Sequence, residues 1–103
     1  MVPDAPTLVP EQATEEKTSL APRWKVILLN DEVTTFDFVI RLLVGLFHKE
    51  AEEAIRLTYE IHVTGAALIT VVNRERAELY LEQVRSLSRP RGFPLTATME
   101  PAD

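Results

Sequence analysis

Hydrophobic residues occur in short blocks from Trp24 onwards, and their spacing predicts the elements of one domain. The apolar run from Trp24 to Leu29 predicts a buried strand. A helix follows from Thr34 or Thr35, where Thr34 and Asp37 resemble a capping box. Its apolar residues form two stripes, which indicates burial on more than one side. The stripes are Phe38, Leu42 and Leu46, and Phe36, Ile40, Leu43 and Phe47, and the helix breaks at His48 and Lys49.

A second helix is predicted over residues 50–62. Ala54, Leu57 and Ile61 recur at the spacing that places them on one helical face. Gly65 then supplies the left-handed backbone conformation that commonly ends a helix. The inner face of this helix is therefore expected to pack against the rest of the domain.

The remaining chain predicts a strand at 67–72, a helix at 74–88 with Asn73 as its N-cap, and a strand at 95–100. Residues 90–92 form a turn between the last two elements. The order is β-α-α-β-α-β. We therefore predict a two-layer α+β domain, with three helices and a three-stranded antiparallel sheet that has one covered face.

Residues 1–23 differ from the rest of the chain. They hold four of the seven prolines and show neither a helical nor an alternating period. This composition predicts a disordered N-terminal arm, either inert or functional, before a core domain at 24–103.

Composition narrows the classes of function. The chain has 103 residues, a net charge of −5 and no cysteine, and it lacks the basic patch that nucleic-acid binders usually carry. It shows no apolar run that could span a bilayer and no secretory signal. We expect a cytoplasmic protein, or a protein of the plastid stroma if the source is a plant or alga, with no nucleic-acid or membrane partner.

The motifs that mark common enzymes are absent. The sequence has no nucleophile elbow, phosphate-binding loop, dinucleotide fingerprint or zinc-protease motif. His48, His62 and Asp31 could in principle hold a metal, but their spacing matches no metal signature. We expect a protein that is not an enzyme and needs no cofactor or metal.

Polar residues at the ends of predicted elements suggest a binding site. Asn30 and Asp31 directly follow the first strand, and His62 lies at the end of the second helix. An amide oxygen, a carboxylate and a neutral imidazole are all hydrogen-bond acceptors, and a primary ammonium has three donors. The alternative for His62 is stabilisation of the helix C-terminus through the helix dipole.

Three segments carry a resemblance to a known family: WKVILLNDEVTTFDFV, AIRLTYEIHVTG and PLTATMEPA. Together they resemble the ClpS adaptors of the ATP-dependent Clp protease. The resemblance implies an adaptor that binds proteins with hydrophobic N-terminal residues and delivers them to a Clp AAA+ unfoldase. It also implies the α+β fold and a flexible N-terminal arm.

The resemblance assigns residues to roles. Asn30, Asp31 and His62 would bind the α-amino group of the substrate. The side-chain pocket would consist of Glu32, Thr34, Phe36, Val39, Thr58, Ile61 and Leu95. Phe36 and Thr58 replace methionines that are common in the family. Phe36 is bulkier and stiffer than a methionine at the pocket entrance, while Thr58 is smaller and opens space deeper in. We therefore expect Leu and Phe as first residues of the substrate and expect Trp to be disfavoured.

The resemblance places the contact with the N-terminal domain of the unfoldase on Glu75 and Tyr80, and Tyr80 replaces a lysine of the family.

Two other interpretations of the function compete with the adaptor. The order of elements also resembles the C-terminal domain of the ribosomal stalk protein, which would make the chain a structural interaction domain. A small hydrolase or metal enzyme is the third interpretation.

Overall fold

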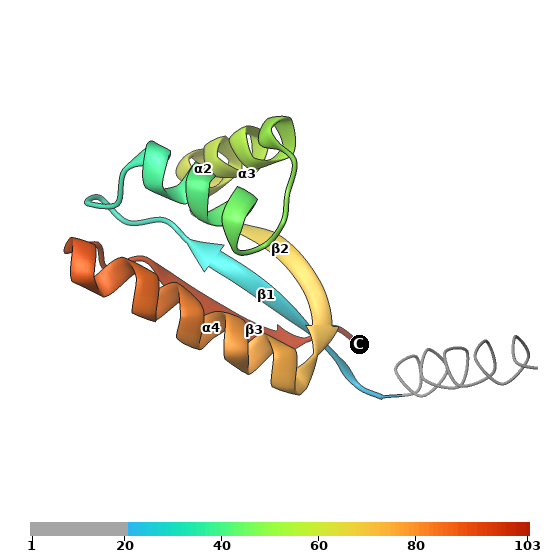
Figure 1. The fold of residues 1–103 in the computed structure, drawn as a ribbon. Helices are drawn as coiled ribbons and strands as arrows, with labels where there is room; N and C mark the ends of the chain where they lie inside the picture. Colours follow the sequence, from blue (N-terminus) through green and yellow to red (C-terminus); the bar gives the residue numbers. More distant parts are fainter. Residues whose placement is uncertain (1–20) are drawn as a thin grey trace, which may run out of the picture.

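The structure is a computed structural model that describes residues 21–103 (Figure 1). Its elements follow the predicted order. They are β1 (Arg23–Leu29), α2 (Phe36–Gly45), α3 (Ala51–Thr64), β2 (Ala66–Asn73), α4 (Arg74–Ser88), the 3-10 turn η1 (Arg89–Arg91) and β3 (Thr96–Pro101). Of the predicted arm, residues 1–20 lie outside the described residues, while Arg23 already belongs to β1.

The three strands form one antiparallel sheet in the order β2-β1-β3, which confirms the predicted sheet. In the central strand, Leu28 lies opposite Ala67 on β2 and Ala97 on β3. A bulge between Val26 and Ile27 shifts the register with β2. Because β1 has a partner on each side, its last residue is held in place where the loop to α2 begins.

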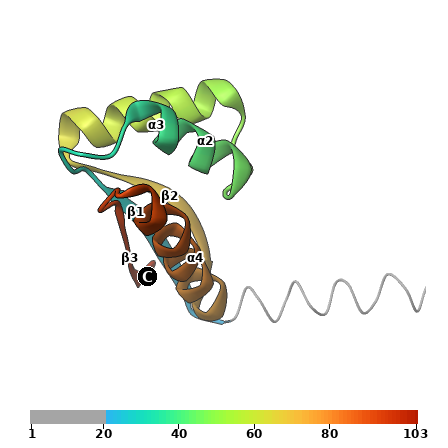
Figure 2. The ribbon, with the colours of Figure 1, turned by 60° about the vertical axis from the view of Figure 1, so that its left-hand side comes forward.

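The helices form two groups around the sheet. Helices α2 and α3 lie together over the end where β1 stops and β2 starts, and α4 lies along the sheet (Figures 1 and 2). One apolar core joins them. It includes Val26 and Leu28 from β1, Leu43 from α2, Ile61 from α3 and Val84 from α4, all at most 3% exposed. The end of β1 and the inner face of α3 therefore share one packed layer.

The helix ends differ in detail from the predicted ones. Thr35, and not Thr34, is the N-cap of α2, because its Oγ1 accepts the N–H of Phe38 at 3.2 Å. Helix α3 extends to Thr64, beyond the predicted end at His62, and Gly65 caps it with a φ of 97°. That positive φ is why glycine suits this position. No helix in the described chain is long and apolar enough to cross a membrane.

Candidate functional site

Asp31 holds the loop between β1 and α2 in shape. Its Oδ1 accepts the N–H groups of Val33 at 2.8 Å and Thr34 at 2.7 Å, and its Oδ2 accepts the Thr34 hydroxyl at 2.7 Å. An aspartate that bonds backbone N–H groups a few residues ahead closes a tight turn. Asp31 therefore fixes the path of the chain from the end of β1 towards α2.

The surroundings of Asp31 keep its carboxyl group charged. Partial burial raises the pKa of Asp31, but hydrogen bonds from Thr34 and Val33 and the positive charge of Arg89 outweigh it, and the pKa lies below the usual value. Hydrogen bonds to the charged form of an acid have this effect in general. The loop thus carries a fixed negative charge at neutral pH.

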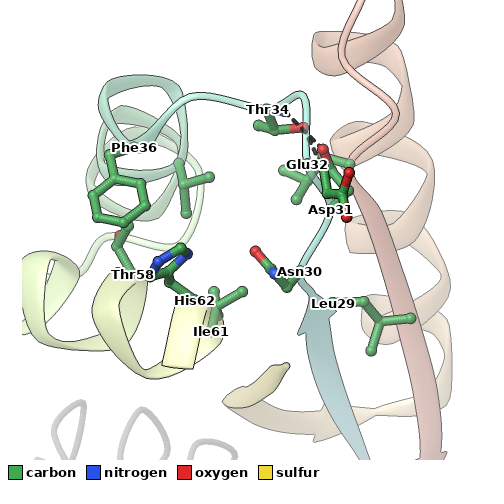
Figure 3. A pocket seen from close by; sticks show the side chains of 11 residues that line it. Leu29, Asn30, Asp31, Glu32, Thr34, Phe36, Thr58, Ile61 and His62 are labelled. Atoms are coloured by element: carbon green, nitrogen blue, oxygen red, sulfur yellow. Dashed lines mark hydrogen bonds between the residues drawn. The ribbon is translucent and has the colours of Figure 1, made fainter. Parts of the chain in front are cut away.

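Asn30 connects this loop to the end of α3. Its backbone N–H donates to the carbonyl oxygen of Gly65 at 2.9 Å. Gly65 follows the last turn of α3, which carries His62. Figure 3 shows the side chain of Asn30 directed towards His62 across the space between the two segments. One backbone hydrogen bond therefore links the segments that carry both side chains.

Phe36, the first residue of α2, packs against the ring of His62. Its ring centroid lies 5.1 Å from that of His62, with the planes at 71°, and 5.2 Å from that of Tyr59, at 85°. Edge-to-face geometry of this kind is favourable for aromatic pairs. These two contacts therefore hold the side chain of Phe36 in place although it is 38% exposed.

These residues surround a single cavity of about 370 Å³ (Figure 3). All ten residues predicted for the α-amino and side-chain sites line it. They are Asn30, Asp31, Glu32, Thr34, Phe36, Val39, Thr58, Ile61, His62 and Leu95. Leu29 also lines the cavity, although its place in the apolar run indicated only a residue of the buried strand. Its position directly before Asn30 was the available signal.

The buried part of the cavity is apolar. Val39, Ile61 and Leu95 are at most 6% exposed. Thr58 is also buried, and its hydroxyl donates to the carbonyl oxygen of Ala54 at 2.7 Å within its own helix. The hydroxyl is therefore already satisfied, so Thr58 behaves as a small, nearly apolar wall residue.

Arg89 in turn η1 holds the backbone of Leu95 in place. Arg89 donates through one guanidinium nitrogen to the carbonyl oxygens of Phe93 at 3.0 Å and Leu95 at 2.8 Å. The side chain of Leu95 itself is only 1% exposed. Turn η1 therefore fixes the backbone that presents this wall of the cavity.

The residues predicted to contact an unfoldase lie elsewhere. Glu75 is exposed in the first turn of α4, beside Trp24 at the start of β1, whereas the cavity lies where β1 ends. Because β1 has seven residues, its two ends are roughly 20 Å apart, and Glu75 and the cavity lie at opposite ends. Tyr80, further along α4, is half-buried, and its ring stacks on Phe47 with centroids 4.5 Å apart. Tyr80 is thus partly a core residue.

The two threonine hydroxyl groups of the cavity take part in hydrogen bonds. Thr34 donates to Asp31 and Thr58 donates to Ala54. Within residues 21–103, no group of three or more histidine, aspartate or glutamate side chains is placed to hold a metal ion. The arrangement combines hydrogen-bond acceptors at the rim with an apolar interior.

Comparison with known proteins gives a consistent result. Residues 19–98 match the model of the family described as ATP-dependent Clp protease adaptor protein ClpS. The ClpS adapter of Nautilia profundicola is 47% identical over 77 residues, which cover 75% of this chain and 79% of the relative. The adapter of Campylobacter jejuni is 39% identical over 94 residues, covering 89% and 98%.

A solved structure is similar as well. Agrobacterium tumefaciens ClpS2 bound to L-phenylalaninamide superposes with a TM-score of 0.75 and 34% sequence identity, covering 78% of this chain and 96% of that chain. The matched residues include β1, the loop that Asp31 closes, and helices α2 to α4. The chain belongs to the ClpS family, the adaptors of the ATP-dependent Clp protease.

Proposed function

We propose that this adaptor binds proteins through their free N-terminal amino group and first side chain and delivers them to a Clp AAA+ unfoldase. One observation carries the proposal: Asn30 and His62 face each other at the rim of a cavity whose interior is apolar. An N-terminal residue with a hydrophobic side chain has the matching chemistry, an ammonium group next to an apolar group.

The ammonium group would use acceptors on both segments of the rim. The amide oxygen of Asn30 and the neutral imidazole of His62 are the direct partners. Asp31 contributes its negative charge, while most of its hydrogen-bonding capacity already serves the loop. Its part in binding the amine is therefore mainly electrostatic, in contrast to the direct acceptor role expected from the sequence.

The side chain of the first residue would occupy the apolar interior. Val39, Thr58, Ile61 and Leu95 form its walls, and burying an unpaired charge there is costly. The similar ClpS2 protein was solved with L-phenylalaninamide, a ligand that has a free amine and an aromatic ring. We infer that this chain prefers Leu and Phe as first residues and disfavours Trp, because Phe36 narrows the rim.

Delivery would use a separate surface. Glu75 on α4 lies at the opposite end of β1 from the cavity, so a partner at Glu75 leaves the bound N-terminus free. We place the unfoldase contact at Glu75 with the exposed edge of Tyr80. No chemical step is required of the adaptor, which we take to be non-catalytic and free of cofactors.

The direct test is a titration with short peptides that differ only in the first residue, each paired with its N-acetylated form. Acetylation removes the charge and two of the three donors. We expect Leu and Phe peptides with free amines to bind and the acetylated peptides to bind at least about tenfold more weakly. Equal affinity for free and acetylated peptides would refute the proposal.

A further inference from the structure

Apolar side chains of α2 and α3 are exposed at the rim of the cavity and beside it. We define the apolar shelf as Phe36, Tyr59 and Val63, which are 38%, 55% and 76% exposed. Tyr59 and Val63 are four residues apart, so they lie on the same face of α3. Together these three side chains form a local apolar surface on an acidic protein with a net charge of −5.

The shelf is continuous with the rim of the cavity. Phe36 lines the cavity and belongs to the shelf, and its ring contacts that of Tyr59 at 5.2 Å. His62, on the last turn of α3, contacts the same Phe36 ring at 5.1 Å. Tyr59 itself does not line the cavity. A ligand that leaves the cavity past Phe36 and His62 therefore meets the shelf next.

We propose that the apolar shelf binds the second side chain of the substrate and favours a large apolar or aromatic residue there. The inference rests on the proposed binding of the N-terminus. Consecutive Cα atoms are about 3.8 Å apart, and successive side chains of an extended peptide point in opposite directions. With the first side chain inside the cavity, the second points out of it, at the rim that the shelf borders.

The rings of the shelf suit this occupant. The edge-to-face contacts of Phe36 leave Tyr59 more than half exposed, so its ring can pack against a further aromatic side chain without displacing a neighbour. A favourable aromatic pair corresponds to roughly a two- to tenfold gain in affinity. We expect that gain when the second residue changes from Ala to Phe.

The test measures the full chain against peptides that begin Leu-Ala, Leu-Ser or Leu-Phe and are otherwise identical. The informative variant is Tyr59→Ala, because alanine is compatible with the helix and Tyr59 is not a cavity residue. Leu79→Ala is the matched control, since Leu79 is 46% exposed on α4. We expect the Leu-Phe preference in the native chain and in Leu79→Ala, and its loss in Tyr59→Ala.

The other outcomes are distinct. Equal affinity for Leu-Ala and Leu-Phe in the native chain, or a preference that survives Tyr59→Ala, overturns the role of the shelf while leaving the proposed function standing. A Tyr59→Ala variant that keeps the peptide ranking but binds the unfoldase more weakly assigns the shelf to that partner and also overturns the inference. Failure of every free-amine peptide to bind better than its acetylated form refutes the proposed function itself.

Discussion

The carboxylate of Asp31 accepts two hydrogen bonds from Thr34, one from the backbone N–H and one from the hydroxyl, each 2.7 Å long. This pair closes the turn that separates the end of β1 from α2. Asn30 and Phe36 lie on either side of that turn and border the cavity from opposite sides (Figure 3). The spacing across the site therefore depends on a contact between two other residues.

Replacing Asp31 with alanine is expected to lower the free energy of unfolding by about 1–3 kcal/mol, because the loop N–H groups and the Thr34 hydroxyl lose a charged acceptor. In the folded protein the pKa of Asp31 lies below the value of about 3.9 that an aspartate has in an unfolded chain. Its stabilising effect is thus complete above that value and is lost as the pH falls through the lower folded pKa. Denaturant unfolding of both proteins across acidic pH should show their difference shrinking. A constant difference would contradict this assignment.

Asn30→Ala and His62→Ala should each weaken the binding of a free-amine peptide by about 1–3 kcal/mol, because the ammonium loses an acceptor. Both side chains are exposed in the free protein, so cooperative unfolding should be retained. Titrations of both variants with free-amine and N-acetylated Leu peptides measure the loss. Unchanged affinity of the His62→Ala variant for the free-amine peptide would exclude His62 as an acceptor.

Phe36→Met should broaden the range of first residues. Methionine has more rotatable bonds than phenylalanine and adapts its shape, and it cannot repeat the two ring contacts with Tyr59 and His62. We expect Trp peptides to gain affinity relative to Leu peptides, by about 1–3 kcal/mol. Titrations with Leu, Phe, Tyr, Trp, Ile and Arg peptides test the ranking. If the native chain already binds Trp best, the rim is not the steric limit.

Glu75→Lys should impair degradation of a substrate by the reconstituted protease without changing peptide affinity, because Glu75 lies at the far end of β1 from the cavity. Glu52→Lys on α3 makes the same charge change on an exposed first turn and serves as the control. Removal of residues 1–20 should likewise spare peptide binding, because every residue of the proposed binding site lies between Asn30 and Leu95. Loss of peptide affinity in Glu75→Lys would show that the two surfaces are not independent.

Local patterns were sufficient for most of the fold. The apolar run before Asn30 predicted β1, and Asn73, which accepts the N–H of Arg76 at 2.8 Å, was identified as the cap of α4. The cap of α2 was misplaced by one residue, because Thr34 and Thr35 are equivalent in local sequence. Only the tertiary path of the loop shows that the Thr34 hydroxyl bonds to Asp31 while Thr35 caps the helix.

The residues that line the cavity were predictable as a set, but their geometry was not. Acceptors at the ends of elements indicated an amine ligand, and the family resemblance supplied the pocket residues. Neither could show that Phe36 contacts His62, because that contact joins the start of α2 to the end of α3. The part of the apolar shelf on α3, Tyr59 and Val63, could not be predicted either. Hydrophobic periodicity identifies the inner face of a helix and assigns no role to the residues of its outer face.

The hydrogen bond from Asn30 to Gly65 has a kinetic consequence. It ties together the two segments that carry Asn30 and His62 before any ligand arrives, so little ordering of the protein remains for the binding step. Association with different N-termini should then occur at similar rates. Discrimination among them would appear as differences in residence time, as is usual among ligands of one interface.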